Sequence, residues 1–422
     1  MTGGIETPLE ASRDRGPQPR LVLGYRPDAW RYLVYTFGSG LSEGFLQVLL
    51  GLYLLSIGYQ ESFVATQGVV VALGSAAFSL LAGVVVDRLG TKVSLLLAAG
   101  LNILGRFLLV AEPSQPAILG ASFVLASGVA FYWVSQGVVL AQVSTPDQRA
   151  GLFGLNWAVL VAAGFVGGLL AGWLPGVIGG ALRIDADDAA AYRYSFWIGV
   201  IALLLGALPL LGFRSGKPER VVHAPGGWWR VSEPRTVARL IIPIAASALA
   251  IGFTVPFMSI FLQGTYNAST RSIGVALGVF SLAGAVGGLL SPRLARRFGA
   301  VRTVSGLLVL SAPLMLLTGY APALGVASIA LWGRGLLANA AWPIALGHLI
   351  ERTGERERGK VSALMNISFE LSLAAAALPA GILMERVDYR LPYLLGTAAL
   401  LLGGLGFAYA SRHEPAARPA VA

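Results

Sequence analysis

The chain has 422 residues, of which 55% are hydrophobic and only 12% are charged. An ordinary soluble domain carries roughly 25% charged residues, so this chain has too few charges to cover a water-exposed surface of its size. It contains no cysteine, which excludes disulfides, zinc–thiolate sites and thiol catalysis. The composition predicts a protein that lies mostly within a lipid bilayer.

The first 29 residues are polar and irregular, and they lack the short apolar core of a signal peptide, so we predict a cytoplasmic tail there. A helix needs about 20 apolar residues to cross the hydrocarbon core. Stretches of this kind recur along the rest of the chain and are separated by short polar turns. The sequence therefore predicts an all-α membrane protein with twelve transmembrane helices. The predicted spans are 30–58, 63–86, 93–111, 116–142, 150–174, 194–213, 238–262, 272–292, 301–319, 323–349, 361–384 and 391–410.

Basic residues gather in alternate loops. If both termini are cytoplasmic, 24 of the 31 Lys and Arg residues lie on the cytoplasmic side, five on the other side and two within spans. Such an excess is typical of cytoplasmic loops. We therefore predict a multi-pass inner-membrane protein with both termini in the cytoplasm. The net charge of +10 reflects this topology and contact with anionic lipid, and it requires no nucleic-acid partner.

An internal repeat divides the chain into two halves. An offset of 209 residues relates Arg88, after the second span, to Arg297, after the eighth, and the same offset relates Arg149 to Arg358. One offset that holds over four spans indicates duplication of a six-helix unit. We predict two pseudo-symmetric six-helix bundles, an architecture typical of secondary transporters that bind substrate between the halves. The predicted segments are an N-terminal tail (1–29), an N-terminal half (30–213), a cytoplasmic linker (214–236), a C-terminal half (237–410) and a C-terminal tail (411–422).

The loop between the second and third spans carries a recognisable motif. The segment Gly83–Lys92 reads GVVVDRLGTK, and it resembles the loop 2–3 signature of the major facilitator superfamily, G-x-x-x-D-R-x-G-[RK]-[RK], with Thr91 as its one departure. The resemblance implies that superfamily's fold and a transporter that alternates between inward-open and outward-open states. A solvated turn that carries positive-inside charges is the alternative interpretation.

The resemblance also implies a cytoplasmic gate in this segment. A glycine such as Gly83 lets two helices approach closely, and Asp87 is expected to hold the positive N-terminus of the eleventh helix. The gate residues that we predict are Gly83, Asp87, Arg88, Gly90, Lys92 and Arg149.

Four charged residues fall within the predicted spans: Glu43, Arg106, Arg334 and Glu370. Each costs a few kcal/mol at the bilayer centre, so each should face a cavity or a partner. We expect Glu43 and Glu370 to couple transport to protons. Glu43 has no charge within helical reach and is the better proton carrier, whereas Arg334 can pair with Glu370 and keep it ionised. A static buried pair with an arginine is the alternative for both glutamates, and Arg106 either snorkels to the interface or has a functional role.

Polar and aromatic side chains near these charges form a candidate substrate cavity. Thr36, Ser39 and Gln47 lie at helical spacing with Glu43 on the first span, and Asn366 lies one turn before Glu370 on the eleventh. Aromatic rings with a few hydrogen-bonding groups suit an amphipathic substrate. The predicted cavity residues are Thr36, Ser39, Gln47, Tyr132, Gln136, Asn156, Arg334, Trp342 and Asn366.

The function that we predict is a secondary active transporter, a proton-coupled exporter of small amphipathic or organic molecules. A proton-coupled importer and a lipid flippase are the alternatives. Gly164, Gly168 and Gly172 match part of the exporter pattern of the fifth helix in the resembling superfamily, but Leu169 and Trp173 depart from it. We expect a monomer whose partners are a small-molecule substrate, protons and the lipid bilayer. We expect no enzymatic activity, no cofactor and no bound metal.

Overall fold

The computed structural model describes residues 25–214, 234–351, 353 and 358–412. Most of the two predicted tails and of the predicted linker lies outside these residues. The regular elements of the described chain are helices. They are α1 (Pro27–Ser56), α2 (Glu61–Leu89), α3 (Thr91–Ala111), α4 (Gln115–Val143), α5 (Pro146–Leu182), α6 (Ala189–Ala207), η1 (Leu208–Gly212), α7 (Pro234–Thr254), η2 (Val255–Phe257), α8 (Met258–Tyr266), α9 (Thr270–Phe298), α10 (Ala300–Tyr320), α11 (Leu324–Glu351), α12 (Arg358–Arg386) and α13 (Leu391–Arg412).

Twelve segments of the described chain are long and apolar enough to cross a membrane, which confirms the predicted number of spans and the fold class. The seventh span is broken, because α7 gives way to the 3-10 turn η2 before α8 continues it. Pro256 lies in that turn and has no N–H to donate to the helix ladder. The fifth span ends eight residues later than predicted, since α5 continues through Pro175 to Leu182.

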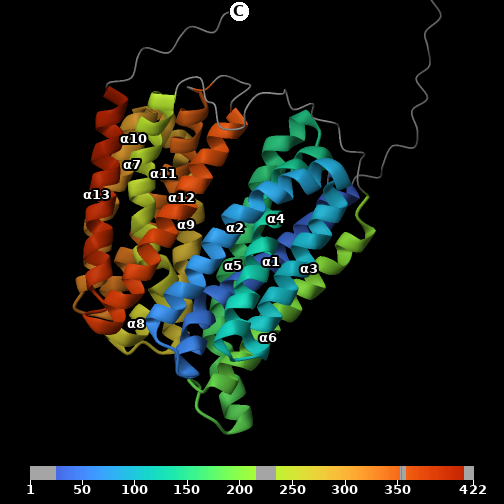
Figure 1. Cartoon of the computed structure of the whole chain (residues 1–422), viewed down its shortest axis with the longest axis vertical. Helices are drawn as coiled ribbons and strands as arrows, with labels where there is room; N and C mark the ends of the chain where they lie inside the picture. Colours follow the sequence, from blue (N-terminus) through green and yellow to red (C-terminus); the bar gives the residue numbers. More distant parts are fainter. Residues whose placement is uncertain (1–24, 215–233, 352, 354–357, 413–422) are drawn as a thin grey trace, which may run out of the picture.

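The helices form two bundles, which we call the N half (α1–α6 with η1) and the C half (α7–α13 with η2) (Figure 1). Within the N half, α3 packs on α4, and α1 packs on α5 and α6; within the C half, α13 packs on α7 and α10 on α11. Small residues make these contacts close. A Cβ at Gly40 or Gly44 on α1 would lie within 2.5 Å of a carbonyl oxygen of α5, so α1 and α5 touch through their backbones.

The repeat is visible in the backbone. Gly90 ends α2 with φ 85° and Gly299 ends α9 with φ 79°, and these two residues are 209 positions apart. With ψ near 150–170°, both have a conformation that is essentially restricted to glycine. The same tight turn therefore joins the second and third membrane spans of each half.

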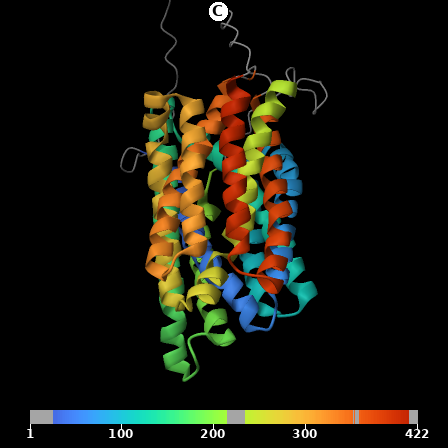
Figure 2. The ribbon, with the colours of Figure 1, turned by 90° about the vertical axis from the view of Figure 1, so that its left-hand side faces the viewer.

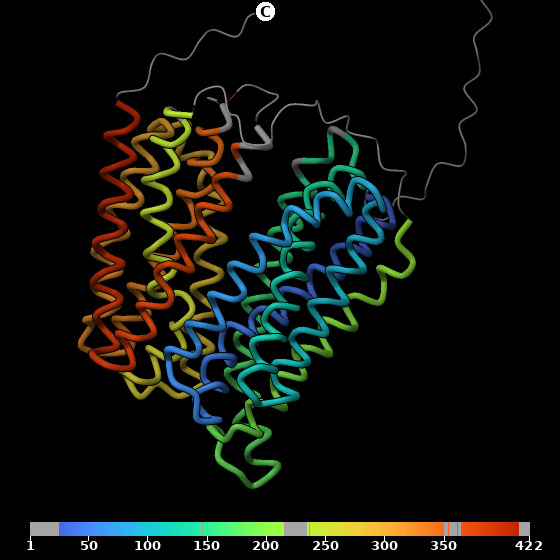
Figure 3. Tube along the Cα trace, viewed as in Figure 1, coloured from blue at the N-terminus to red at the C-terminus, as the bar shows by residue number. Residues whose placement is uncertain are grey.

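The two halves meet at one end and diverge toward the other, as Figures 1 and 3 show. The diverging end carries the start of α1, which begins at Pro27, and the end of α13, which ends at Arg412, and we call it the chain-end face. The opposite end is called the far end. Between the halves, α5 packs on α9 and α2 packs on α12. Figure 2 shows the C half from the side, with its helices running nearly parallel from one end to the other.

Candidate functional site

The N half contains an ion pair between α1 and α3. Arg106 Nη2 lies 2.7 Å from Glu43 Oε2, and Arg106 Nη1 donates to the Ser42 carbonyl oxygen at 2.8 Å and contacts Ser42 Oγ at 3.2 Å. The Arg106 side chain is 5% exposed, whereas that of Glu43 is 58% exposed. Arg106 therefore points into the N half and does not snorkel to the membrane interface. It holds one oxygen of a carboxylate whose other side remains accessible.

A pair with an arginine was the alternative predicted for Glu43, but the sequence did not identify Arg106 as that arginine. Glu43 and Arg106 are 63 positions apart and lie on different helices. The one available signal was the presence of two opposite charges within spans of the same half.

Predicted cavity residues of the N half form a buried polar group next to this pair. Thr36 Oγ1 donates to Asn156 Oδ1 at 2.8 Å, and both side chains are buried. Tyr132 is also buried, and its ring lies 5.8 Å from that of Tyr35, edge to face. Among the described residues, the Tyr35 and Tyr132 hydroxyls and Ser39 Oγ are buried without a hydrogen bond of standard geometry, although Tyr35 lies near Ser39 and Tyr132 near Thr36. In this conformation these side chains are part of the interior of the N half rather than of an accessible surface.

Other predicted cavity residues are more accessible. Gln47 and Gln136 are partly exposed. Ser281 on α9 donates to Gln47 Oε1 at 3.4 Å, so α1 contacts the C half at this level. In the C half, Asn366 is exposed, and Trp342 packs edge to face on Phe369 with the ring centres 4.8 Å apart.

The expected pair between Arg334 and Glu370 is not formed. Arg334 is 2% exposed, and its guanidinium lies over the ring of Phe280 on α9, 5.2 Å from the ring centre. Its Nε and Nη2 atoms have no hydrogen-bond partner in the part of the chain that the structure describes. Glu370 on α12 is partly exposed and takes part in none of the ion pairs found among the described residues. The Arg334 side chain turns toward α9 and away from α12, a direction that helical spacing along α11 cannot reveal.

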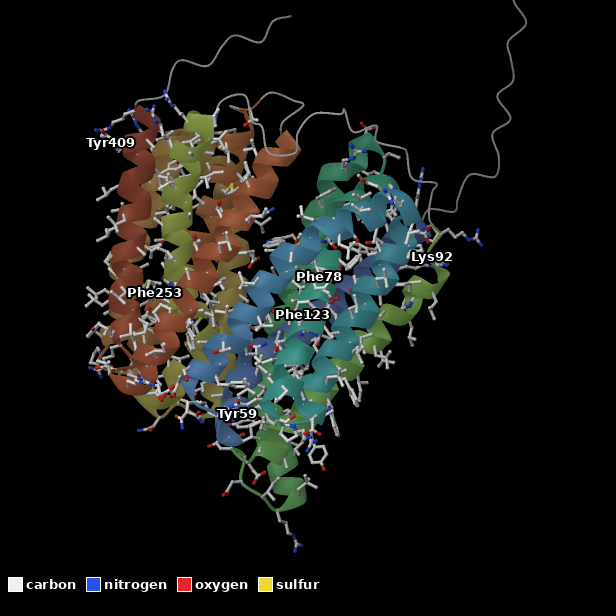
Figure 4. All side chains as sticks on the ribbon, viewed as in Figure 1. Tyr59, Phe78, Lys92, Phe123, Phe253 and Tyr409 are labelled. Carbon is white, nitrogen blue, oxygen red and sulfur yellow. The ribbon has the colours of Figure 1, made fainter. Side chains whose placement is uncertain are left out.

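The predicted gate residues lie at the chain-end face, where the halves diverge. Asp87, Arg88 and Arg149 are exposed, and Lys92 Nζ donates to the Leu211 carbonyl oxygen at 2.9 Å. Figure 4 labels Lys92 at this end of the N half. No atom of another described helix lies within 4 Å of the position that a Cβ at Gly83 would take. The close helix approach expected at Gly83 is therefore absent from this conformation.

The one departure from the loop motif has a structural explanation. Thr91, which replaces a basic residue of the signature, is buried, and its hydroxyl donates to Gln142 Oε1 on α4 at 2.9 Å. A charged side chain at this buried position would lose its hydration. Thr91 therefore ties the start of α3 to the end of α4.

Comparison with known proteins identifies the family. The sequence model of the Major Facilitator Superfamily matches residues 32–241 and 240–421, which together span nearly the whole chain. The chain belongs to the Major Facilitator Superfamily. It is a membrane transporter of that superfamily, and both the motif resemblance and the duplicated six-helix fold are confirmed.

Two superfamily members of Bacillus subtilis (strain 168) are similar in sequence. The MFS-type transporter YceJ, described as uncharacterised, is 24% identical over 75% of this chain and 79% of its own length. A methylenomycin A resistance protein is 28% identical over 53% of this chain and 58% of its own length. Among solved structures, a bacterial homologue of the human lysosomal transporter Spinster, inward-facing and unoccupied, superposes with a TM-score of 0.71. It is 16% identical over 92% of this chain and 97% of its own, which shows the fold alone.

Proposed function

We propose that this superfamily transporter is a proton-coupled exporter of small amphipathic or organic molecules that works by alternating access. The observation that carries the proposal is the state of Arg334 and Glu370. Both lie within membrane spans, and neither is neutralised by an oppositely charged side chain among the described residues. Charges of this kind are costly in a bilayer and mark substrate or proton pathways by default.

The conformation fits one end state of an alternating cycle. In this proposal the chain-end face is cytoplasmic, which agrees with the excess of Lys and Arg in the loops of that face. The halves diverge there and pack together at the far end (Figure 1). The state is then inward-facing, like that of the Spinster homologue on which the chain superposes.

Export is supported by the resistance relative and by the glycines of α5. Resistance to an antibiotic is the expected consequence of pumping it out of the cell, and the methylenomycin A resistance protein is similar over about half of this chain. Gly168 and Gly172, two of the three glycines that match the exporter pattern, contact Gly278 and Gly274 of α9 across the halves. These contacts let α5 and α9 approach at the far end.

The two predicted proton-coupling residues differ in their surroundings. Among the described residues Glu370 has no cationic partner, so taking up a proton removes an uncompensated charge from the membrane. Glu43 is held by Arg106, and a proton on its carboxyl would leave a buried guanidinium without its counter-ion. We therefore assign the main proton-coupling role to Glu370 and a secondary one to Glu43. This reverses the order expected from the sequence.

The test uses everted membrane vesicles with an acidic lumen and methylenomycin A as the probe. We expect the wild-type chain to accumulate the probe in the lumen, and Glu370→Gln to lose gradient-driven accumulation while it still exchanges the probe without a gradient. Ser372→Ala is a matched control on α12, because the Ser372 hydroxyl bonds only to its own helix. Accumulation only in right-side-out vesicles with an acidic exterior would indicate an importer. Movement of a labelled phospholipid without movement of any soluble compound from a panel would indicate a flippase.

A further inference from the structure

Two groups of hydrogen bonds join the halves at the far end. In the first, the Tyr389 hydroxyl in the α12–α13 turn donates to Glu61 Oε1 at the start of α2. The Ser62 N–H, also at the start of α2, donates to Glu385 Oε2 on α12 at 3.3 Å. We call these four residues clasp A. Each of its bonds runs from one half to the other.

The second group lies at the start of α9. Thr270 Oγ1 donates to Asp187 Oδ1 in the α5–α6 loop at 3.0 Å, and the same oxygen accepts a bond of 2.8 Å from the Tyr192 hydroxyl of α6. Tyr192 and Thr270 are buried, and their hydroxyl oxygens are 3.1 Å apart. We call Asp187, Tyr192 and Thr270 clasp B. It ties the first turn of a C-half helix to a loop of the N half.

The two clasps are related by the repeat. Glu61 is the first residue of α2 and Thr270 the first of α9, and they are 209 positions apart. A Cβ at Gly381 of α12 would lie 2.7 Å from the Glu61 carbonyl oxygen, and one at Gly172 of α5 would lie 2.8 Å from the Thr270 carbonyl oxygen. Gly172 and Gly381 are also 209 positions apart. Each clasp is therefore backed by a glycine that brings a helix of the other half against the same first turn.

The chemistry of the two clasps is reversed. In clasp A the helix supplies the carboxylate and the loop supplies the hydroxyl, whereas in clasp B the loop supplies the carboxylate and the helix supplies the hydroxyl. In both, a carboxylate from the opposite half lies at a helix N-terminus, where the helix dipole favours negative charge. Burial and the neighbouring Glu61 carboxylate raise the pKa of Tyr389 above its usual value, so its hydroxyl stays protonated as a donor.

We propose that clasps A and B are the paired locks of the far-end gate, and that both must open before the substrate site can face that side. The inference rests on the proposed alternating cycle and names the residues that hold one of its end states. Because hydrogen bonds to charged groups contribute more than neutral ones, removing one hydroxyl should favour the open far end by about tenfold. Removing one hydroxyl from each clasp should favour it by about a hundredfold if the clasps act independently.

The test follows opening through a single buried cysteine. Ser259 on α8 is buried against Gly51 of α1, across the halves, and the natural chain has no cysteine. The near-isosteric Ser259→Cys is labelled by a maleimide only when the halves separate there. In purified protein, we expect Tyr389→Phe and Thr270→Val each to speed this labelling about tenfold, and the double variant to speed it about a hundredfold.

Tyr59→Phe is the matched control. The Tyr59 hydroxyl also lies at the far end (Figure 4), but it donates to the Pro113 carbonyl oxygen within the N half, so its loss should leave the labelling rate unchanged. A double variant that elutes and melts as a folded protein but labels at the wild-type rate would overturn the proposal. If the double variant does not fold, the single variants decide: labelling of both at the wild-type rate would overturn the proposal.

A second readout separates the clasps from the transport cycle. Val93 and Arg302, 209 positions apart, are exposed at the chain-end face, one in each half, and can carry a pair of spin labels. If the clasps gate an alternating cycle, the variants that speed far-end labelling also shorten the distance between these labels. Faster labelling with an unchanged label distance would leave the clasps as locks of the far end and contradict the proposed alternation.

Discussion

The N half and the C half treat the charges within their spans differently. In the N half, Arg106 on α3 reaches α1 and neutralises Glu43 with a contact of 2.7 Å. In the C half, Arg334 on α11 lies over Phe280 and leaves two guanidinium nitrogens without an acceptor, while Glu370 on α12 takes part in none of the ion pairs of the described chain. A satisfied pair can hold helices together, but an unsatisfied charge persists at a cost in stability.

Comparing repeat-related positions shows that these charges are not inherited from the repeat. The positions 209 residues from Glu43, Arg106, Arg334 and Glu370 hold Gly252, Met315, Leu125 and Val161. The backbone therefore tolerates an uncharged residue at each of the four sites. The halves share their helix order and turns, but they differ in which positions within the spans carry charged residues. The N half uses its charges mainly to fix α3 against α1, and the C half keeps its charges available.

The largest expected effect tests the structural role of the N-half pair. Glu43→Gln removes the counter-ion of a buried arginine, but the Glu43 side chain is 58% exposed and water can replace part of the lost contact. The substitution should therefore lower the free energy of unfolding by about 1–2 kcal/mol. Glu370→Gln, at an unpaired site, should leave it unchanged or slightly raise it. Thermal denaturation of the purified variants measures both. Adding Arg106→Gln to Glu43→Gln should recover part of the loss, and equal effects of the two glutamate substitutions would contradict the difference between the halves.

An intermediate effect of opposite sign is expected in the C half. Arg334→Met keeps an apolar chain of similar length and removes two unsatisfied buried donors, at the cost of the contact with Phe280. We expect the variant to be about 1 kcal/mol more stable than the wild type and to lose transport of methylenomycin A. Arg106→Met, at the buried arginine of the N half, should instead be less stable. Destabilisation by Arg334→Met would show that Arg334 has a structural role.

The smallest expected effect concerns the chain-end face. Asp87 has no acidic equivalent in the C half, because the position 209 residues later is Arg296. If Asp87 holds a helix N-terminus when the halves close at this face, Asp87→Asn weakens that state by about 0.3–1 kcal/mol. The population of short distances between spin labels at Val93 and Arg302 should then fall up to about fivefold. Arg296→Gln serves as the control, and identical changes in both variants would remove any special role of Asp87.

Some site residues could be predicted from local pattern and others could not. Gly90 was identified from a motif, and the structure explains it through its positive φ. Thr91 was recorded as a departure, and its hydrogen bond to Gln142 became visible only once α3 and α4 were placed side by side. The pairing expected between Arg334 and Glu370 was wrong. The two residues lie on consecutive spans, but this does not fix the direction in which the long Arg334 side chain points. The clasps escaped prediction because their residues lie at helix ends and in turns that are far apart along the chain, up to 328 positions for Glu61 and Tyr389.

By itself, the sequence determined the number of spans, the duplication and the family. The spans are visible because a bilayer-spanning helix satisfies its backbone within about 20 consecutive residues. The duplication is visible as a fixed offset, and the family as a ten-residue motif. Only the tertiary structure decided which charge meets which. Glu43 contacts Arg106, which lies 63 positions away along the chain. Tyr389 contacts Glu61, which lies 328 positions away. Such contacts depend on helix packing and side-chain direction, which hydropathy and spacing along one helix do not encode.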